Sequence, residues 1–313
     1  MSKTIAVVAT GGTIACTTDE HGALVPTVSA AELVEAARSL AAPDLGPGAQ
    51  ESLEFDTLPI DSVRLDSSSL TLTDLDDLLQ RVHSLLADSE ISGVVITHGT
   101  DSMEDTAMAL ELFHTSKKPV VITGAQRSFD HPDTDGPQNL ADAISYCAGG
   151  TSGVSIRFGG LTIPARGAFK AHTSSLEAFR ATPQNIRPRP ALPLTPLAGQ
   201  DVVIVSAWPG APRLLVDSAV ASGANGIIIE ALGSGNMGSA MGEGVKDALE
   251  AEIPVLITTR VPEGAVTLAY GGSGGGATLS QAGALGTGTL RAGQARMVLL
   301  AALATNTDVA ELL

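Results

Sequence analysis

The stretch IAVVATGGTIAC, residues 5–16, runs from an apolar segment straight into Thr10-Gly11-Gly12-Thr13. An uninterrupted run of small and β-branched residues predicts a strand buried on both faces, as in a parallel sheet covered by helices. The two glycines permit a tight turn where that strand ends. In a parallel sheet the ligand crevice lies beyond the carboxyl ends of the strands. We therefore expect the two threonine hydroxyls at the edge of the sheet that carries the chemistry.

Further short apolar runs share this character and alternate with segments of helical period. They cover residues 53–58, 93–98, 119–124, 153–158, 201–208, 226–232 and 254–261. Helix starts are indicated by Ser29 with Glu32, a capping-box pattern, and by Thr73, Ser102 and Asn139. The alternation predicts an α/β fold with mainly parallel sheets flanked by helices.

The segment TPQNIRPRPALPLTPLAGQ, residues 182–200, is rich in proline and leaves no room for a helix. Such composition predicts an extended linker, and the alternation of strands and helices restarts after it. We therefore expect two α/β domains. A larger N-terminal catalytic domain covers residues 1–190, and a smaller C-terminal domain with its own parallel sheet covers residues 191–313.

Composition excludes several classes of function. The 313-residue chain has a formal net charge of −16 and no basic stripe, which argues against a nucleic-acid partner. Its two cysteines, Cys16 and Cys147, are too few for a disulfide framework, and the six histidines form no ligand pair. We expect a reduced, cytoplasmic protein without metal or cofactor. The first apolar run is too short for a signal peptide or a membrane span.

Polar residues follow each of the first strands in turn. They lie at 10–13, 66–69, 97–102 and 123–127 and supply hydroxyls, an acid and glycine-flanked backbone amides. Each group alone has an ordinary structural interpretation as a turn, a loop or a helix cap. Their shared place at one edge favours a crevice for a small polar molecule that carries both charges.

These groups belong to longer motifs that span the chain. The motifs are TGGTIA (10–15), VVITHGTDSMEDTA (94–107), VITGAQR (121–127), DGPQNLADA (135–143), GAFKAHTSSLEAF (167–179) and GTLRAGQARMVLLAAL (288–303). In this order they resemble the bacterial-type L-asparaginase (asparaginase/glutaminase) family. The resemblance implies hydrolysis of the side-chain amide of L-asparagine to L-aspartate and ammonia, with glutamine sometimes a poorer substrate.

The resemblance also implies roles for individual residues. Thr13 matches the family's nucleophile, and Thr100, Asp101 and Lys170 match its threonine–aspartate–lysine group. A threonine hydroxyl needs a neighbouring base, and a departing ammonia needs a proton. We expect a covalent acyl-enzyme on Thr13, cleared by water that Thr100 and Lys170 activate. Direct attack by water activated at Thr100 is the alternative.

Substrate-binding positions follow from the same resemblance. Asp101 is expected to bind the α-ammonium group and Ser67 the α-carboxylate of the substrate. The remaining expected contacts are Gly12, Ser68, Gly99, Ala125 and, from a neighbouring subunit, Asn236. Backbone amides near Thr100 and Ala125 are expected to stabilise the oxyanion. Ser68 stands where many relatives carry glutamine, so the preference between asparagine and glutamine stays open.

Two positions depart from the family pattern. The lid segment CTTDEHGALVPTV (16–28) has no tyrosine, so Thr17, Thr18, His21 or water would have to assist the nucleophile. The neighbouring-subunit glutamate of relatives falls around Gly276, where this chain has no acid. The family habit implies a homo-oligomer, a tetramer of two tight dimers, with each site completed by a partner chain.

Three other functions compete with this interpretation. GSGNMG (233–238) fits a dinucleotide fingerprint, but the next strand ends in Arg260 without the expected acid. A non-catalytic amino-acid binder would explain the missing tyrosine and glutamate but not the complete set of Thr13, Thr100, Asp101 and Lys170. The third is an amidase of broader asparagine and glutamine specificity, or one that supplies ammonia to aminoacyl-tRNA. An ammonia-supplying amidase would favour a basic RNA-binding extension, which this acidic chain lacks.

Overall fold

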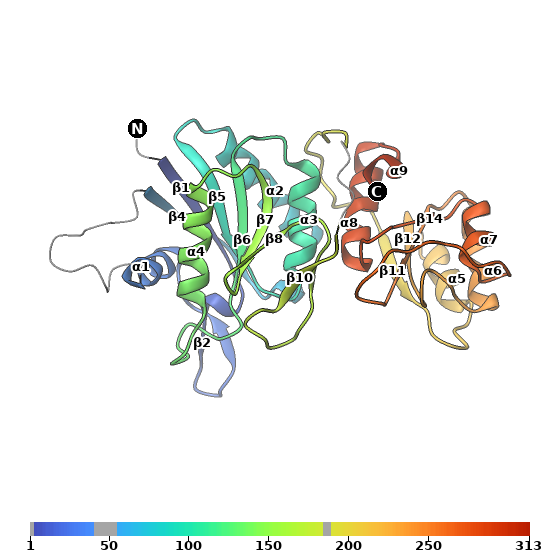
Figure 1. Ribbon diagram of the computed structural model, residues 1–313, viewed down its shortest axis with the longest axis horizontal. Helices are drawn as coiled ribbons and strands as arrows, with labels where there is room; N and C mark the ends of the chain where they lie inside the picture. Colours follow the sequence, from blue (N-terminus) through green and yellow to red (C-terminus); the bar gives the residue numbers. More distant parts are fainter. Residues whose placement is uncertain (1–2, 41–54, 184–188) are drawn as a thin grey trace. The chain divides into compact units, whose positions relative to one another are not determined.

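The computed structural model describes residues 3–40, 55–183 and 189–313. The chain divides into two compact units, Met1–Arg180 and Ala181–Leu313 (Figure 1). The division falls at the start of the proline-rich segment, of which residues 184–188 lie outside the described part.

The first unit is built on a six-stranded sheet with the order β4-β1-β5-β6-β7-β8. Its strands are β1 (Lys3–Gly11), β4 (Phe55–Leu65), β5 (Ile91–Thr97), β6 (Pro119–Thr123), β7 (Gly153–Phe158) and β8 (Leu161–Pro164). All neighbours pair in parallel except β7 and β8, which are antiparallel. The predicted mainly parallel sheet is confirmed.

Helices cover both faces of this sheet (Figure 1). On one face α1 (Ala30–Leu40) and α4 (Gly136–Ala148) share a core with Ile5 and Val7 of β1. Ala6 and Val8 alternate with these two residues along the strand, point the other way and are equally buried. That face is covered by α2 (Leu72–Ala87) and α3 (Met103–Phe113). Burial on both faces explains why the strands read as continuous apolar runs.

Short elements lie at the carboxyl edge of the sheet. Two single turns of 3₁₀ helix, η1 (Thr13–Ala15) and η2 (Ser67–Ser69), follow β1 and β4. The strands β2 (Cys16–Thr18) and β3 (Leu24–Pro26) form an antiparallel hairpin. A further two-stranded sheet pairs β9 (Ala168–Lys170) with β10 (Phe179–Ala181). Sequence periodicity predicted neither small sheet, because runs of three residues carry too little pattern.

The second unit has a parallel four-stranded sheet with the order β11-β12-β13-β14. The strands are β11 (Val202–Ser206), β12 (Gly226–Ala231), β13 (Val255–Thr259) and β14 (Leu285–Gly286). The helices α5 (Leu214–Ala221), α6 (Ser239–Glu250) and α7 (Gly276–Gln281) share one core cluster with the sheet. Helix α8 (Ala292–Thr305) also packs on the sheet, and α9 (Val309–Leu312) packs on α8.

Some predicted boundaries were wrong. The helix expected after Thr73 begins at Leu72, because Thr71 and Asp74 form a reciprocal capping box two residues earlier. Asn139 does not precede its helix but lies inside α4, where its side chain donates to the carbonyl of Gly124. Within the described residues, no helix has the length and apolar character needed to cross a bilayer.

Candidate active site

The ends of the four neighbouring strands β4, β1, β5 and β6 are in direct contact through glycine. A Cβ atom on Gly12 would lie 2.4 Å from the N and Cα atoms of Gly99, and one on Gly11 would lie 2.7 Å from the carbonyl oxygen of Leu65. A Cβ on Gly124 would lie 2.4 Å from the carbonyl oxygen of His98. Gly11 and Gly12 also have φ angles of 95° and 77°, which side chains strongly disfavour. Glycine is therefore required for this edge to close.

The two predicted catalytic threonines flank this contact. Thr13 directly follows Gly12 and is the half-buried first residue of η1. Thr100 directly follows Gly99 and is 6% exposed. The structure thus brings the main chains of Thr13 and Thr100 to the same point of the sheet edge, each one residue from the glycine–glycine contact.

Lys170 joins Thr100 and Asp101 although it is about seventy residues away in sequence. Its Nζ donates to Thr100 Oγ1 at 2.8 Å and to Asp101 Oδ1 at 2.7 Å. The lysine side chain is 20% exposed and the aspartate side chain 64% exposed. The lysine side chain is therefore largely enclosed, whereas the aspartate side chain is open to solvent. The structure brings this predicted group of three together.

Ser67 connects the end of β4 to the start of α3. Its Oγ accepts the backbone N–H of Asp101 at 3.1 Å, and its carbonyl accepts the hydroxyl of Ser102 at 2.7 Å. A Cβ on Gly99 would lie 2.5 Å from Ser67 Oγ, so this buried hydroxyl lies against the Gly99 backbone. The neighbouring Ser68 side chain is exposed.

His98 lies within the polar group predicted at residues 97–102, but sequence analysis assigned it no role of its own. Its ring is almost completely buried, with Nδ1 2.7 Å from the carbonyl oxygen of Gly99 and Nε2 3.1 Å from Thr106 Oγ1. Since a carbonyl only accepts, the hydrogen-bond network assigns the proton to Nδ1 and leaves Nε2 to accept from Thr106. Burial lowers the pKa of His98, so the ring is kept neutral and holds the Gly99 carbonyl in place.

The loop after β6 is fixed by Asp135, which directly precedes α4, and by Asn139 within that helix. The Asp135 carboxylate accepts the backbone N–H groups of Gln126 and Arg127, at 3.1 and 2.9 Å. Asn139 donates to the carbonyl of Gly124 at 3.0 Å. Ala125, between these anchors, is buried. The motif DGPQN contained both anchoring residues, but sequence alone did not connect them with the loop that they hold.

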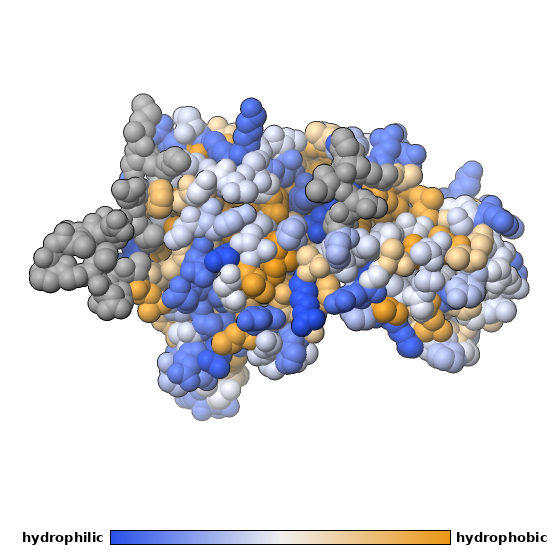
Figure 2. Space-filling model, in the orientation of Figure 1, coloured by the Kyte–Doolittle hydropathy of each residue, from blue (hydrophilic) through white to orange (hydrophobic). Residues whose placement is uncertain are grey.

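The β2–β3 hairpin corresponds to the predicted lid segment. It is joined to residues 129–130, because Phe129 N donates to the Cys16 carbonyl at 2.8 Å and Thr18 N donates to Asp130 Oδ2 at 2.7 Å. Thr17 Oγ1 is 2.8 Å from Thr27 Oγ1. The tip of the hairpin is hydrophilic (Figure 2), and the His21 side chain in that segment is exposed. Of the groups expected to replace the lid tyrosine, the Thr17 hydroxyl is paired within the hairpin and the His21 ring faces solvent.

The buried Cys16 thiol at the base of the hairpin donates to the Gly12 carbonyl at 3.3 Å. Burial first, and then the nearby carboxylates of Asp66 and Asp130, raise the pKa of Cys16 to about 11. The thiol therefore stays protonated near neutral pH and is not a nucleophile.

In the second unit, Asn236 and Gly276 are neighbours, with Asn236 Oδ1 accepting the Gly276 N–H at 3.3 Å. A Cβ on Gly276 would lie 2.7 Å from Leu268 Cα and 3.0 Å from the Gly235 carbonyl oxygen. The position therefore lacks not only an acid but also the space for any side chain. Met237 N also donates to the Gly274 carbonyl at 2.9 Å. The glycine-rich segment at residues 270–276 therefore packs on the turn at residues 233–238, which resembled a dinucleotide fingerprint.

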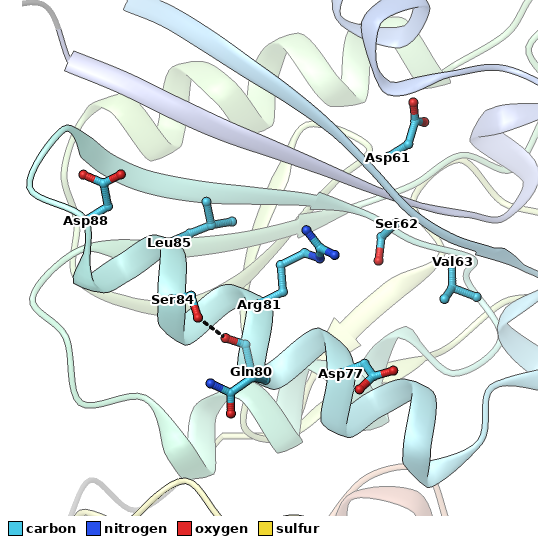
Figure 3. A pocket seen from close by; sticks show the side chains of 9 residues that line it. All are labelled: Asp61, Ser62, Val63, Asp77, Gln80, Arg81, Ser84, Leu85 and Asp88. Atoms are coloured by element: carbon cyan, nitrogen blue, oxygen red, sulfur yellow. Dashed lines mark hydrogen bonds between the residues drawn. The ribbon is translucent and has the colours of Figure 1, made fainter.

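Other candidate sites are weak. Across residues 3–40, 55–183 and 189–313, no three His, Cys, Asp or Glu side chains are grouped to hold a metal. A surface groove of about 800 Å³ lies between β4 and α2, and Asp61, Asp77 and Arg81 are among its lining residues (Figure 3). Its charged side chains are exposed, and it includes none of the predicted site residues.

Comparison with known proteins places the chain among amidohydrolases. The family model described as "Asparaginase, N-terminal" matches residues 4–187, and "Glutaminase/Asparaginase C-terminal domain" matches residues 201–312. An L-asparaginase of Bacillus licheniformis is 28% identical, with 97% of each chain covered. A component of the glutamyl-tRNA(Gln) amidotransferase of Methanopyrus kandleri is 30% identical and matches 84% of this chain but 63% of its own length.

Among solved structures, the thermostable L-asparaginase from Thermococcus kodakarensis superposes with a TM-score of 0.80 at 26% identity. The superposition covers 98% of this chain and 95% of that one. The two family models together span both units. The Bacillus licheniformis relative is similar to this chain in sequence, and the Thermococcus kodakarensis structure is similar to it in fold. The chain belongs to the asparaginase family.

Proposed function

We propose that this protein hydrolyses the side-chain amide of L-asparagine to L-aspartate and ammonia. Thr13 is the nucleophile, and Thr100, Asp101 and Lys170 form a proton-transfer group. Residues 1–190 act as the catalytic domain and residues 191–313 as the C-terminal domain. The observation that carries the proposal is the position of Lys170 Nζ, 2.8 Å from Thr100 Oγ1, beside the Gly12–Gly99 contact that precedes both threonines.

The chemistry proceeds in two displacements. Thr13 Oγ attacks the amide carbon and loses its proton, and the tetrahedral intermediate expels the nitrogen as ammonia once it is protonated. Water then attacks the resulting ester carbon, the hydroxyl of Thr13 regains a proton, and aspartate leaves. Lys170 is in hydrogen-bond contact with Thr100 and can move a proton to or from its hydroxyl at Oγ1. Direct attack by a water activated at Thr100 is the alternative route.

The charge pattern suits an amino-acid substrate. The Asp101 carboxylate, open to solvent beside Lys170, is positioned to bind the α-ammonium group. Ser67 Oγ accepts from Asp101 N, which leaves its own proton to donate to an α-carboxylate. Gly12, Gly99 and Ala125 supply close backbone surfaces, and amides near Thr100 and Ala125 are the proposed oxyanion donors.

An amidase of broader asparagine and glutamine specificity is the second candidate. The observation that favours it is the short, exposed Ser68 at the position where a longer side chain would restrict the substrate. A role as an ammonia-supplying component of a tRNA-modifying enzyme is less favoured, because the chain carries a formal charge of −16.

We infer that the site is completed by a second copy of the chain, in a tetramer of two tight dimers, with Asn236 contributed across the interface. A cytoplasmic location is part of the same proposal and is supported by two free, buried cysteines. Light scattering coupled to size exclusion measures the oligomeric state directly.

Ammonia release from asparagine and from glutamine, each followed by a coupled assay, tests the proposed function. We expect asparagine to have the higher kcat/KM. No ammonia from either amide would leave the amino-acid binder as the better assignment, and calorimetry with L-aspartate would then measure binding.

A further inference from the structure

The short strand that carries Lys170 is held to α3 at two points. Arg166, 6% exposed, donates from Nε and Nη2 to the two oxygens of Glu111, at 3.2 and 3.1 Å. Four residues later, the backbone N–H of Lys170 donates to Glu104 Oε2. Glu104 and Glu111 are seven residues apart and so lie on one face of the helix.

The second anchor bears directly on the proton-transfer group. Lys170 donates its main-chain N–H to Glu104, while its side chain reaches Thr100 Oγ1 and Asp101 Oδ1. Thr100 and Asp101 precede α3, and Glu104 lies in its first turn. Residues at and just before the start of α3 therefore contact both the main chain and the side-chain ammonium group of Lys170.

We propose that Glu104 is a positioning residue, which fixes the Lys170 main chain on α3 so that Nζ stays between Thr100 and Asp101, and that its ionised form holds the lysine best. This inference rests on the proposed function only for its effect on turnover, since the contact itself can be observed without a substrate.

The environment of Glu104 makes this contact sensitive to pH. Burial and the neighbouring Asp105 on the same helix raise the pKa of Glu104 to about 7, while the Lys170 N–H bond and the Lys170 charge from β9 act in the opposite direction. Above pH 7 the carboxylate is ionised and accepts a charge-assisted hydrogen bond, about twice as strong as the bond to a neutral carboxyl. Lys170 is therefore held more firmly as pH rises through 7.

Glu104→Gln tests the proposal, because the amide oxygen can still accept the Lys170 N–H but cannot ionise. In the wild type we expect kcat for asparagine to rise with pH through an inflection near 7. In Glu104→Gln the inflection disappears, and kcat above pH 8 falls by about tenfold with KM changed less than about twofold. Glu111→Gln is the matched control on the same helix face, and its inflection stays in place.

A second readout does not depend on activity. In an amide NMR spectrum of the full chain labelled with ¹⁵N and deuterium, the Lys170 N–H resonance of the wild type is expected to shift with a midpoint near pH 7. The same resonance of Glu104→Gln is expected to show no such shift. A wild-type Lys170 resonance that ignores pH between 5 and 9 would overturn the inference.

The two readouts separate this inference from the proposed function. If the wild type releases no ammonia, the asparaginase assignment fails, and the titration of the Lys170 amide still decides whether the contact forms. If the wild type is active but Glu104→Gln keeps its full kcat and its pH inflection, the positioning role is refuted. Thermal unfolding shows whether the variant is folded. We expect it to be at least as stable as the wild type above pH 7, because position 104 then no longer buries a charge.

Discussion

The backbones of Gly12 and Gly99 are in van der Waals contact, so tightly that a Cβ on Gly12 would lie 2.4 Å from Gly99 Cα. This contact joins the ends of β1 and β5 and sets Thr13 and Thr100 one residue beyond it on either side. A side chain at Gly12 would push these strand ends apart, and one at Gly99 would collide with Ser67, which follows β4. The main chains of two threonines that are far apart in sequence therefore lie close together, as the proposed mechanism requires.

Thr13→Ala should lower kcat for asparagine by at least about a thousandfold, because the proposed nucleophile is removed. The fold should be retained, since Thr13 is only half-buried. Ammonia release and thermal unfolding are the measurements. Thr162→Ala, an exposed threonine of β8, is the control and should keep activity within about threefold. Substantial turnover by Thr13→Ala would remove Thr13 as nucleophile.

Lys170→Met should lower kcat by about a hundredfold, because proton transfer at Thr100 loses its partner. The unbranched methionine replaces much of the lysine stem, so KM should change less than kcat. Steady-state kinetics at several pH values give both parameters. Lys246→Met, a lysine of α6 paired with Glu243, serves as control. A near-normal rate in Lys170→Met would exclude the lysine from the mechanism.

Gly276→Ala should destabilise the second unit by about 1–3 kcal/mol, because the new methyl group would lie 2.7 Å from Leu268 Cα. Gly271→Ala, where a Cβ would have nothing within 4 Å, is the matched control and should leave stability nearly unchanged. Denaturant unfolding measures both. For the same steric reason, Gly276→Glu should not improve substrate binding. Equal stability of the two alanine variants would show that the segment around Leu268 moves to accommodate the added methyl group.

His98→Asn should destabilise the protein by about 1–3 kcal/mol at pH 7.5, because Thr106 loses its acceptor. The pKa of His98 is lowered by burial from its ordinary value of 6.5, so the folded state favours the neutral ring. Its contribution is present above pH 6.5 and is lost as pH falls toward the lowered pKa. The stability difference between wild type and variant should therefore shrink toward pH 5, as measured by urea unfolding. A difference independent of pH would contradict a neutral His98.

Much of the fold could be predicted from local pattern. The apolar runs around Val7, Val95 and Val121 are buried on both faces, and this produces the uninterrupted apolar sequence that identified them as parallel strands. The family and the α/β fold class were likewise predicted and are confirmed. The three-residue strands and the Thr71 cap were not predicted, because a segment of three or four residues is too short to show a hydrophobic periodicity.

The candidate site could be predicted only in part. The residues after each strand are visible in sequence, since parallel strands must end at one edge. The roles of Thr13, Thr100 and Lys170 remain predictions for the experiments above. The supporting contacts of Glu104, His98 and Asp135 were not predicted. The residues next to each of them in the sequence do not indicate which distant group it contacts.

The sequence by itself determined which segments become strands, where glycines end them and which hydroxyls follow, because these properties depend on neighbours along the chain. Only the tertiary structure decided that Lys170 meets Thr100 and Asp101, that Glu104 holds the lysine's main chain, and that the space at Gly276 is already filled. The lysine's contacts join segments about seventy residues apart, and the space at Gly276 is closed where a turn packs against a helix start. These contacts depend on how the elements pack in space, to within a fraction of an ångström. Such distances cannot be predicted from local sequence patterns.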